Sequence, residues 1–576
     1  MAMLLKRVER PRELKWYQAG AMLYGDWGTS KAYVLGIAFA LCGHGSWFLL
    51  GLMSALTALV GMCYMTICRV YPDGGGVYSS VKHRSRLLAV VGALLLIADY
   101  VVTASLSAFE AFHYFNSSNP TLWAIVAIVV IGAINWVGPT KGGSIASVIA
   151  LAASVVAGIL FLFTLPSLPH VDLQWPRGGF LHNWTTFVGI VLALSGVEAV
   201  ANLTGIMAEP VEKTSKRAIW PVLLEVSIVT FLLGVAMNAI PGLTDHAEDM
   251  LRVLGTYYIG PWYGHLISVI FGFLLLSACN TALTGLVNIQ FLMAKDRELP
   301  DIFSRLNRYG MPGVALVVAT LVPAFVLTLE HDLVGLAALY AIGVVGAITI
   351  NLLATATSFN LPLSKKERVF LFFSGAILLL IELTIAIQKH AALFFALTTV
   401  GTGLALRQIA KTFLPAPVPA LATTVVNVLT VSEAKEIAPL YKSSSLVALR
   451  TLNQRLLDEA ALRMKALGEN SVYLNYVEET PPGRELPTEL EPSRESLELL
   501  TKAQEVMEKK GITAIPVWQA GENPGRLIAH SAQELGVNTV MIGTTQRSAL
   551  VGLIRGDVFR SLTKNLPREC HLVITG

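Results

Sequence analysis

Six acidic side chains stand within or at the edges of long apolar stretches. They are Asp26, Asp99, Glu110, Glu198, Glu225 and Glu382. A carboxylate at the centre of a lipid bilayer costs at least about 2.5–3.5 kcal/mol, so each group requires a partner or a function. We interpret Glu225 and Glu382 as structural, because they lie near the ends of their stretches or among few polar neighbours. Glu110 could serve a function within the membrane, or it could equally lie near the membrane surface, where it needs none.

Two of these acids accompany interruptions in their apolar stretches. Asp26 lies between two glycines, and glycine disfavours a helix. Glu198 comes shortly after the small residues Ser195 and Gly196. Unwound backbone at membrane depth is tolerated only where it lines a cavity or is buried in protein. Interruptions at corresponding positions in the two halves of a membrane domain therefore indicate a substrate site near the middle of the membrane. The alternative is that these glycines merely let helices pack closely.

A third apolar stretch carries hydroxyl groups at helical spacing. Tyr100, Thr103 and Ser107 recur at steps of three and four residues, so they share one face of a helix. Together with the carbonyl groups of an unwound helix and the Asp26 carboxylate, they would form an oxygen-rich site. Such a site suits a cation such as K⁺ or Na⁺. The alternative is that the Ser and Thr hydroxyls bond back to carbonyls of their own helix.

The elements that must position these residues are membrane-spanning helices. Mean hydropathy is +0.60, and only 14% of the 576 residues are charged. Apolar runs of about 20 residues, the length that crosses a bilayer, follow one another up to residue 412. They predict an all-α polytopic membrane domain over residues 1–415. Its twelve spans are expected at roughly 18–41, 46–70, 87–115, 121–138, 143–165, 182–207, 217–241, 261–294, 312–330, 333–358, 366–388 and 390–412.

Lysine and arginine indicate how these spans are oriented. The amino-terminal tail and alternate loops carry most of them, whereas the intervening loops hold only Arg177, Arg252 and Lys389. Because positively charged loops remain in the cytosol, we expect both ends of the chain there, in a multi-pass protein of the plasma membrane. The net charge of +4 is too small to favour nucleic acid as a partner.

The sequence around Asp26 resembles a known family. Residues 25–30 read GDWGTS and residues 33–35 read YVL. This string resembles the first-helix signature of KUP-type potassium transporters, and most closely that of the KimA-type importers, which share a soluble carboxy-terminal extension. The loop at residues 72–78 and the segment 195–199 are similar to the wider amino acid-polyamine-cation superfamily.

The resemblance implies a fold of five plus five inverted repeats, potassium import by proton symport, and a homodimer joined through cytoplasmic domains. The residues that match the family's ion-binding or proton-sensing positions are Asp26, Tyr33, Tyr100, Thr103, Ser107, Ser195 and Glu198. Of these, Asp26, Thr103 and Ser107 would contact the potassium ion.

Glu198 and Lys31 bear on the interpretation as a proton-coupled potassium importer. Glu198, or otherwise Asp26, would couple uptake to protons, because a carboxyl group in the site can hold a proton when the site is empty and lose it when a cation binds. Lys31 stands where the KUP pattern has proline. A lysine so close to Asp26 fits a cation site only if it points outward or pairs with another acid such as Glu110.

A different organisation follows a linker at residues 416–443. Five short apolar segments alternate with helical ones, at 446–449, 472–477, 512–517, 539–542 and 572–574. This alternation predicts a doubly wound parallel sheet in a cytoplasmic α/β domain over residues 444–576.

The end of this α/β domain resembles the nucleotide loop G-x2-G-x9-G-[ST] of universal stress proteins. Gly543 and Gly556 fit the pattern, but Gln546 replaces the middle glycine and Asp557 replaces the hydroxyl. An aspartate at this place repels phosphate. We therefore expect the fold without ordinary ATP binding, and a role in dimerisation or in regulation by another ligand, such as a different nucleotide.

Three functions remain open at this point. A proton-coupled potassium importer is the leading hypothesis. An amino acid permease of the same fold would hold the substrate carboxylate at the first interruption, where Asp26 would repel it. A membrane sensor would have no need of paired interruptions. The sequence contains no catalytic triad, phosphate-binding P-loop or zinc spacing, so we expect neither an enzyme nor a resident cofactor.

Overall fold

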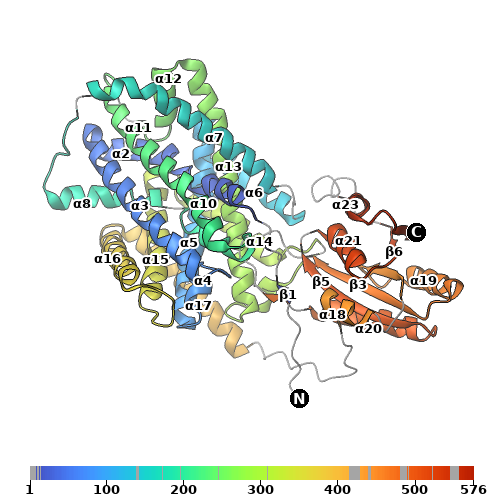
Figure 1. The fold of residues 1–576 in the computed structure, drawn as a ribbon. Coiled ribbons are helices and arrows are strands. Elements are labelled where there is room, and N and C mark those ends of the chain that lie inside the picture. Colours follow the sequence, from blue (N-terminus) through green and yellow to red (C-terminus); the bar gives the residue numbers. More distant parts are fainter. Residues whose placement is uncertain are drawn as a thin grey trace.

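The computed structural model divides into a large helical part and a smaller α/β part (Figure 1). It describes residues 8–9, 12, 14–137, 142–171, 173–194, 196–243, 246–307, 309–413, 428–438, 443–479, 489–490, 492–521, 523–544 and 557–575. The helical part ends with residue 413, and the α/β part begins at residue 428.

The helical part consists of long helices joined by short turns. The α-helices are α1 (Trp16–Trp27), α2 (Ser30–Cys42), α3 (Ser46–Val70), α4 (Val77–Val81), α5 (Arg86–Tyr114), α6 (Pro120–Val137), α7 (Gly142–Thr164), α8 (Phe180–Gly189), α9 (Ala199–Asn202), α10 (Val211–Leu224), α11 (Thr230–Ala236), α12 (Met250–Tyr258), α13 (Pro261–Lys295), α14 (Gly313–Leu329), α15 (Leu333–Ala356), α16 (Lys365–Gln388) and α17 (His390–Phe413). The shorter turns are η1 (Gly43–Gly45), η2 (Leu165–His170), η3 (Val191–Leu194), η4 (Thr204–Ile206), the π-helical η5 (Glu225–Val229), η6 (Met237–Ala239) and η7 (Asp301–Ser304).

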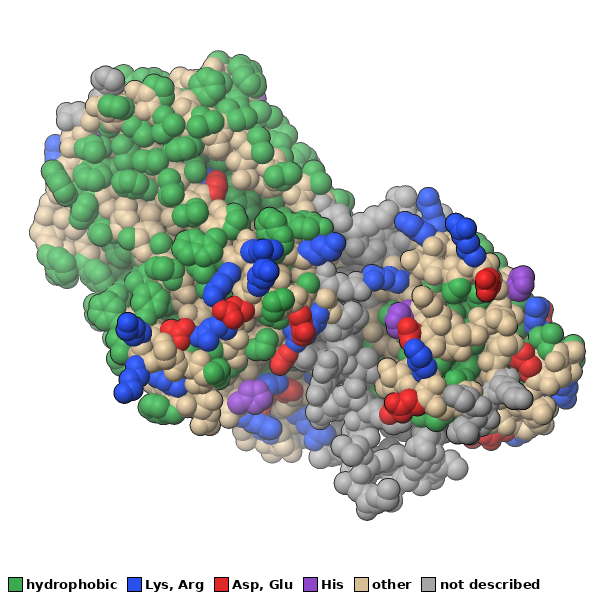
Figure 2. Space-filling view, in the orientation of Figure 1, with side chains coloured by type: hydrophobic (Ala, Val, Ile, Leu, Met, Phe, Trp, Pro, Cys, Tyr) green, Lys and Arg blue, Asp and Glu red, His purple; other side chains and the backbone are tan. Residues whose placement is uncertain are grey.

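Many of these helices are long and apolar enough to cross a membrane. Within the described residues there are nine such segments, and ten if the bent pair Phe180–Gly189 and Val191–Ile206 forms one span. Large apolar side chains such as Val148, Leu151 and Phe325 are exposed on this part of the molecule. Figure 2 shows this apolar surface in green, with charged side chains gathered below it. The predicted multi-span helical domain is thus confirmed. The number twelve stays a prediction, because the segment Trp16–Val70 holds three helices and α14 is shorter than the others.

The seventh predicted span begins too late in the sequence. Helix α10 starts at Val211, six residues before the expected boundary at residue 217. Its first turns carry Lys213 and Lys216, and Lys216 forms an ion pair of 2.7 Å with Glu212 one turn earlier. Polar residues at this spacing support a helix as well as apolar ones do. The apolar run therefore marks the part of the helix that suits lipid, and the helix itself continues beyond it.

The α/β part contains the predicted parallel sheet. Its strands are β2 (Ser445–Leu449), β3 (Ser471–Glu479), β5 (Thr513–Gly521), β6 (Thr539–Gly543) and β7 (His571–Thr575), in the order β5-β3-β2-β6-β7. All four neighbouring pairs are parallel. The helices are α18 (Val431–Ile437), α19 (Gln454–Leu467), α20 (Arg494–Glu508), α21 (Pro524–Glu534) and α23 (Val558–Asn565).

The helices of the α/β part cover both faces of the sheet. Leu456 of α19 and Leu500 of α20 belong to one apolar cluster, whereas Ala434 of α18, Ile528 of α21 and Leu562 of α23 belong to a second. This is the arrangement of a doubly wound sheet. Helix α18 lies in the stretch that the sequence assigned to a linker, and it packs on the sheet. The remainder of that stretch, residues 416–427 and 439–442, lies outside the described residues.

The amino-terminal tail contacts both parts of the chain. Strand β1 (Val8–Glu9) pairs antiparallel with β4 (Glu489–Leu490) of the α/β part. The backbone of Leu14 then bonds to the end of the sixth span, with its N–H donating to the Ile206 carbonyl at 3.0 Å and its carbonyl accepting from the Ala208 N–H at 2.9 Å.

Arg12 adds side-chain bonds to this junction. Its Nη1 donates to the Pro72 carbonyl at 3.0 Å and to the Thr204 carbonyl at 3.2 Å. The guanidinium also pairs with Asp73 and lies 3.5 Å from Glu209. One side chain thus connects the tail, the loop before the third span and the end of the sixth span.

Candidate functional site

The first span is interrupted at Gly28 and Thr29. Helix α1 ends at Trp27, and α2 begins at Ser30. The Thr29 hydroxyl donates to the Asp26 carbonyl, and the Ser30 hydroxyl donates to the Trp27 carbonyl at 2.8 Å. Regular α-helix is therefore interrupted at the predicted place, although Gly28 and Thr29 keep right-handed helical dihedral angles. The Asp26 side chain stands on the last turn before this interruption, 7% exposed. Of the two glycines beside Asp26, Gly25 lies inside α1 and only Gly28 belongs to the break.

The sixth span is interrupted between Leu194 and Ala199, where η3 ends and α9 begins. Gly196 has a φ of +95°, a conformation that favours glycine. Its N–H donates to Glu198 Oε2 at 3.1 Å, so the carboxylate folds back over the break. Ser195, the other small residue predicted here, lies outside the described residues.

The two interruptions touch each other. A Cβ atom at position 196 would lie 2.7 Å from the Trp27 nitrogen and 2.8 Å from the Trp27 Cα. The backbone of the sixth span therefore approaches the backbone of the first as closely as glycine allows. As a result, the carboxyl groups of Asp26 and Glu198 come from elements that meet at one place.

A third carboxyl group, that of Asp99 on α5, joins them. It is fully buried, and it interacts electrostatically with Glu198 and with Asp26. Thr103 donates its hydroxyl to the Asp99 carbonyl at 2.8 Å and lies 3.4 Å from Asp99 Oδ1. Thr103 thus bonds back to its own helix, as the alternative interpretation expected, but a hydroxyl oxygen that donates keeps its lone pairs for a cation.

Asp99 is an acid that sequence reasoning left out of the site. The sequence did contain a pattern that points to Asp99, because this residue precedes Thr103 by four residues and so shares its helical face.

Three tyrosines surround the acids. Tyr100 accepts a hydrogen bond of 3.0 Å from Asn202 of α9, so it connects α5 to the sixth span. Tyr33 is buried on α2 and interacts electrostatically with Asp26 and Asp99. Tyr340 of α15, which the sequence did not single out, interacts electrostatically with all three carboxyl groups. Ser107 is buried one turn beyond Thr103.

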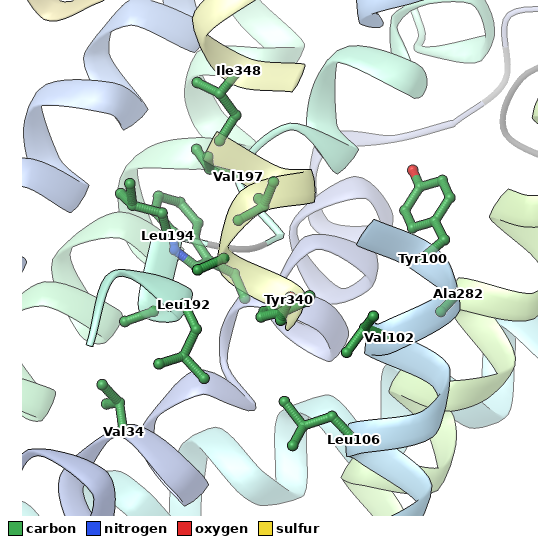
Figure 3. Close-up of a cluster of buried hydrophobic side chains, with 14 of the residues drawn as sticks. Val34, Tyr100, Val102, Leu106, Leu192, Leu194, Val197, Ala282, Tyr340 and Ile348 are labelled. Carbon is green, nitrogen blue, oxygen red and sulfur yellow. The ribbon is translucent and has the colours of Figure 1, made fainter. Parts of the chain in front are cut away.

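Apolar side chains form the rest of the walls around this place (Figure 3). Leu192, Leu194 and Val197 lie along the sixth-span segment, and Tyr340 and Ile348 project from α15 opposite them. All five side chains are at most 1% exposed. Such walls keep water out and strengthen the electrostatic interactions among the groups that they enclose.

Lys31 does not take part in the acidic cluster. Its Nζ lies 2.8 and 2.9 Å from the two carboxylate oxygens of Glu225 in the π-helical turn η5, and 3.1 Å from the Tyr24 hydroxyl. Its partner is thus Glu225, and not Glu110 as the sequence suggested. The pair also accounts for Glu225, which we had interpreted as structural.

The arrangement offers oxygen acceptors of several kinds. In the part of the chain that the structure describes, no three His, Cys, Asp or Glu side chains converge closely enough to hold a metal ion by themselves. A cation bound here would therefore draw on hydroxyl and carbonyl oxygens as well as carboxylates, which is the mixed coordination that weakly charged cations accept.

The candidate nucleotide site of the α/β part is only partly described. Gly543 ends β6, whereas Gln546 and Gly556 lie outside the described residues. Asp557 caps the start of α23, and its Oδ1 accepts a hydrogen bond of 2.8 Å from the Phe559 N–H. The amide Nδ2 of Asn453 would lie 3.2 Å from a Cβ at Gly543, at the carboxyl end of the strands where doubly wound sheets bind their ligands.

Comparison with known proteins identifies the class of the molecule. Residues 14–429 match the amino acid permease family, and this match covers most of the chain. The chain therefore belongs to this family of membrane transporters, which is not a family of enzymes.

Its relatives differ in the substrates that their names indicate. The chain is 25% identical to the potassium transporter KimA of Bacillus subtilis over 371 residues, which are 58% of this chain and 60% of that protein. It is also 25% identical to L-asparagine permease 1 of Mycobacterium tuberculosis over 434 residues, 68% of this chain and 86% of the permease. An uncharacterized protein of Methanocaldococcus jannaschii is 25% identical over 316 residues, 51% and 71% of the two chains. The match thus spans less than two thirds of the Bacillus transporter, and the names alone leave the substrate open.

Proposed function

We propose that this transporter imports potassium ions together with protons. The observation that carries the proposal is the gathering of three carboxyl groups, those of Asp26, Asp99 and Glu198, where two interrupted spans meet. Like charges in a buried site repel one another unless a cation or a proton compensates them. The nearby Lys31 is held by Glu225, so its charge is directed to another acid.

The ion is proposed to lie between α5 and the first interruption. Asp26, Thr103 and Ser107 would contact it, and Tyr33, Tyr100 and Ser195 would line the site. Backbone carbonyl oxygens beside Gly28 would complete the coordination, since potassium selects for several oxygen ligands in place of its water shell.

Glu198 is proposed to couple the ion to the proton, with Asp26 as the other candidate. Burial in an apolar site favours the neutral form of a carboxyl group, and a bound cation favours its ionised form. Glu198 would therefore hold a proton before potassium enters from outside, and the bound cation would favour release of that proton to the cytosol together with potassium. Glu198 is 6% exposed, which suits a carboxyl group that holds a proton.

An amino acid permease is the second candidate, and the likeness to L-asparagine permease 1 favours it. A permease would place the substrate carboxylate near the amino-terminal end of a half-helix. At α2 that end lies next to the Asp26 carboxylate, which would repel the substrate. The likeness to a potassium transporter supports the first proposal instead.

Several features of the architecture belong to the same proposal. The membrane domain would have twelve spans in five plus five inverted repeats, and both ends of the chain would lie in the cytosol below the plasma membrane. The α/β part would be a universal stress protein-like domain over residues 444–576. It would join two copies of the chain into a homodimer and bind a regulatory ligand, such as a nucleotide other than ATP.

Growth of a bacterium that lacks its own potassium uptake tests the substrate. We expect the full chain to restore growth at limiting K⁺, and Asp26→Asn to abolish this rescue although the protein still reaches the membrane. Thr103→Ala and Ser107→Ala, which remove neutral ligands, should raise the potassium requirement only several-fold. Glu382→Gln removes an acid from α16 and serves as the control that should still rescue.

The proton is tested in the same cells. Glu198→Gln should flatten the dependence of potassium uptake on external pH, and an unchanged profile would move the coupling role to Asp26. Uptake of labelled amino acids is measured in parallel. Amino acid uptake without any potassium rescue by the wild-type chain would contradict the proposal and favour the permease.

A further inference from the structure

We propose that Glu110 of α5 is a second proton-binding site, separate from the central cluster, through which protons pass between that cluster and the membrane surface away from the amino-terminal tail. The inference rests on the proposed function, because the protons concerned are those that accompany potassium.

The first observation is the burial of Glu110. Its side chain is 0% exposed, and within the described residues neither Oε1 nor Oε2 has a hydrogen-bond partner. An ionised carboxylate that is buried without hydrogen bonds is very costly, whereas the protonated form is tolerated far better. The sequence left open a place near the membrane surface for Glu110, and the structure shows this side chain buried within the protein.

The second observation is the charge of its surroundings. Glu110 interacts electrostatically with Glu248 and Asp249, which precede α12. Arg252 is engaged by Asp249, because its Nε donates to Asp249 Oδ2 at 2.9 Å, and His246 Nδ1 lies 3.1 Å from Asp249 Oδ1. The charge that faces Glu110 from this loop is therefore acidic, and it adds to the cost of a second negative charge.

Two phenols complete the titratable groups around Glu110. Tyr33 of α2 interacts electrostatically with it, as does Tyr114 of its own helix. The Tyr114 hydroxyl donates to the Ala32 carbonyl at 2.8 Å, so its proton is already used. Neither phenol compensates a negative charge as a lysine or arginine would.

The third observation is the line that these residues form along α5. Asp99, Thr103, Ser107, Glu110 and His113 follow one another at steps of four, four, three and three residues. Such steps place side chains on one face of a helix. At a rise of 1.5 Å per residue, Glu110 lies about 16 Å along the helix from Asp99, which is too far for one ion to contact both.

The outer end of this line reaches water. His113 Nδ1 lies 2.6 Å from Glu248 Oε2, and the side chains of His113 and Glu248 are 18% and 46% exposed. Exposure thus falls from Glu248 through His113 to Glu110. A proton that enters from water at this end can pass to the Glu110 carboxylate and then, through Ser107 and Thr103, to an acid of the central cluster that has lost its own.

Purified full-length protein in proteoliposomes tests the role of Glu110. An enclosed pH dye reports the proton influx that a potassium gradient drives, and labelled rubidium reports cation exchange at equal pH and potassium on both sides. We expect Glu110→Gln to lower potassium-driven proton influx at least tenfold, while exchange stays within twofold of the wild type. Glu110→Asp should restore proton influx because it restores an acid.

The control is Glu382→Gln, which removes another acid of the helical part whose Oε2 has no hydrogen-bond partner within the described residues. It should behave as the wild type in both assays. Wild-type proton influx in Glu110→Gln would overturn the inference and leave potassium import intact. Loss of exchange as well as influx in both Glu110 variants would reveal a purely structural role and overturn it too. A wild-type chain that moves no protons with potassium would overturn both proposals.

Discussion

Lys31 brings a positive charge into the interior of the helical part, and Glu225 compensates it. The Lys31 side chain is 0% exposed and that of Glu225 is 16% exposed. Two carboxylate oxygens of Glu225 and the Tyr24 hydroxyl accept hydrogen bonds from the ammonium group. The pair connects α2, directly after the first interruption, to the π-helical turn of the seventh span. It therefore fixes the position of the helix that carries Tyr33.

Breaking this pair from one side should destabilise the protein more than removing both partners. Lys31→Met leaves the Glu225 carboxylate uncompensated, which costs about 3–5 kcal/mol for a buried pair. The double variant Lys31→Met/Glu225→Leu should recover most of the loss. Melting temperatures of the detergent-purified variants provide the measurement. Lys82→Met is the control, because its 3.4 Å pair with Asp296 is about one third exposed and is worth at most about 1 kcal/mol. Equal melting temperatures for Lys31→Met and the wild type would contradict this role.

At the scale of single residues, the sequence shows which charged side chains are costly to bury, but not which of them contact one another. Asp26 and Glu198 could be selected because each stands beside small residues that disfavour a helix. The partner of Lys31 could not, since Glu225 is 194 residues away in the chain. Tyr340 gave no signal, because an aromatic residue in an apolar helix is ordinary. Asp99 could have been selected from its spacing to Thr103.

Among the elements, the contact between the two interruptions depends on one glycine. Gly196 combines a positive φ with a close approach to the Trp27 backbone. A side chain at this position would have to displace backbone atoms, which cannot rotate away as a flexible side chain can. The distance between Asp26 and Glu198 therefore depends on the absence of a Cβ atom at Gly196.

Gly196→Ala should separate the two interruptions. The added methyl group is strained at a φ of +95° and overlaps the Trp27 backbone, so we expect potassium uptake to fall at least tenfold in the rescue strain. Gly25→Ala is the matched control, since a Cβ there meets nothing within 4 Å and alanine favours the helix. If both variants transport alike at equal membrane abundance, the contact does not matter for transport.

The positions of the helices and strands agree better with the sequence-based predictions than the contacts between them do. Apolar runs predicted the long helices because a span must satisfy its own backbone within lipid. Helix α10 began earlier than expected, since charged residues can extend a helix into water. The five strands of the parallel sheet agree within a few residues with the predicted segments, because buried parallel strands are short continuous apolar runs. No single segment of the sequence indicates which strands are neighbours in the order β5-β3-β2-β6-β7.

For the whole molecule, the α/β part carries a place where sheets of this kind bind ligands. Its sheet has a reversal of strand order between β2 and β6, and ligands of such sheets bind beside the carboxyl ends of the strands at that point. Asn453 caps α19 there, with its Oδ1 accepting from the Leu456 N–H at 3.2 Å. Asp557 caps α23 with its carboxylate. The two caps supply an amide and a negative charge, which is a poor receptor for the phosphates of ATP.

ATP should therefore stabilise the full-length protein very little. A ligand at a hundredfold excess over its dissociation constant contributes about 2.7 kcal/mol, so we expect millimolar ATP to leave the melting temperature of the α/β part unchanged. The variant Gln546→Gly/Asp557→Ser, which restores the nucleotide motif, should respond more strongly than the wild type. A large shift in the wild type would show that this part binds ATP despite the two substitutions.

The bonds of Arg12 bear on the rate at which the transporter would turn over. Its bonds to Pro72, Asp73, Thr204 and Glu209 hold three segments together on the side where the tail lies. A carrier that discharges its cargo on that side has to break these bonds in each cycle and form them again. In the proposed import cycle these bonds would lengthen the lifetime of the form that is closed on that side and slow turnover. They would also limit leakage, because an empty carrier has no binding energy from cargo with which to break them.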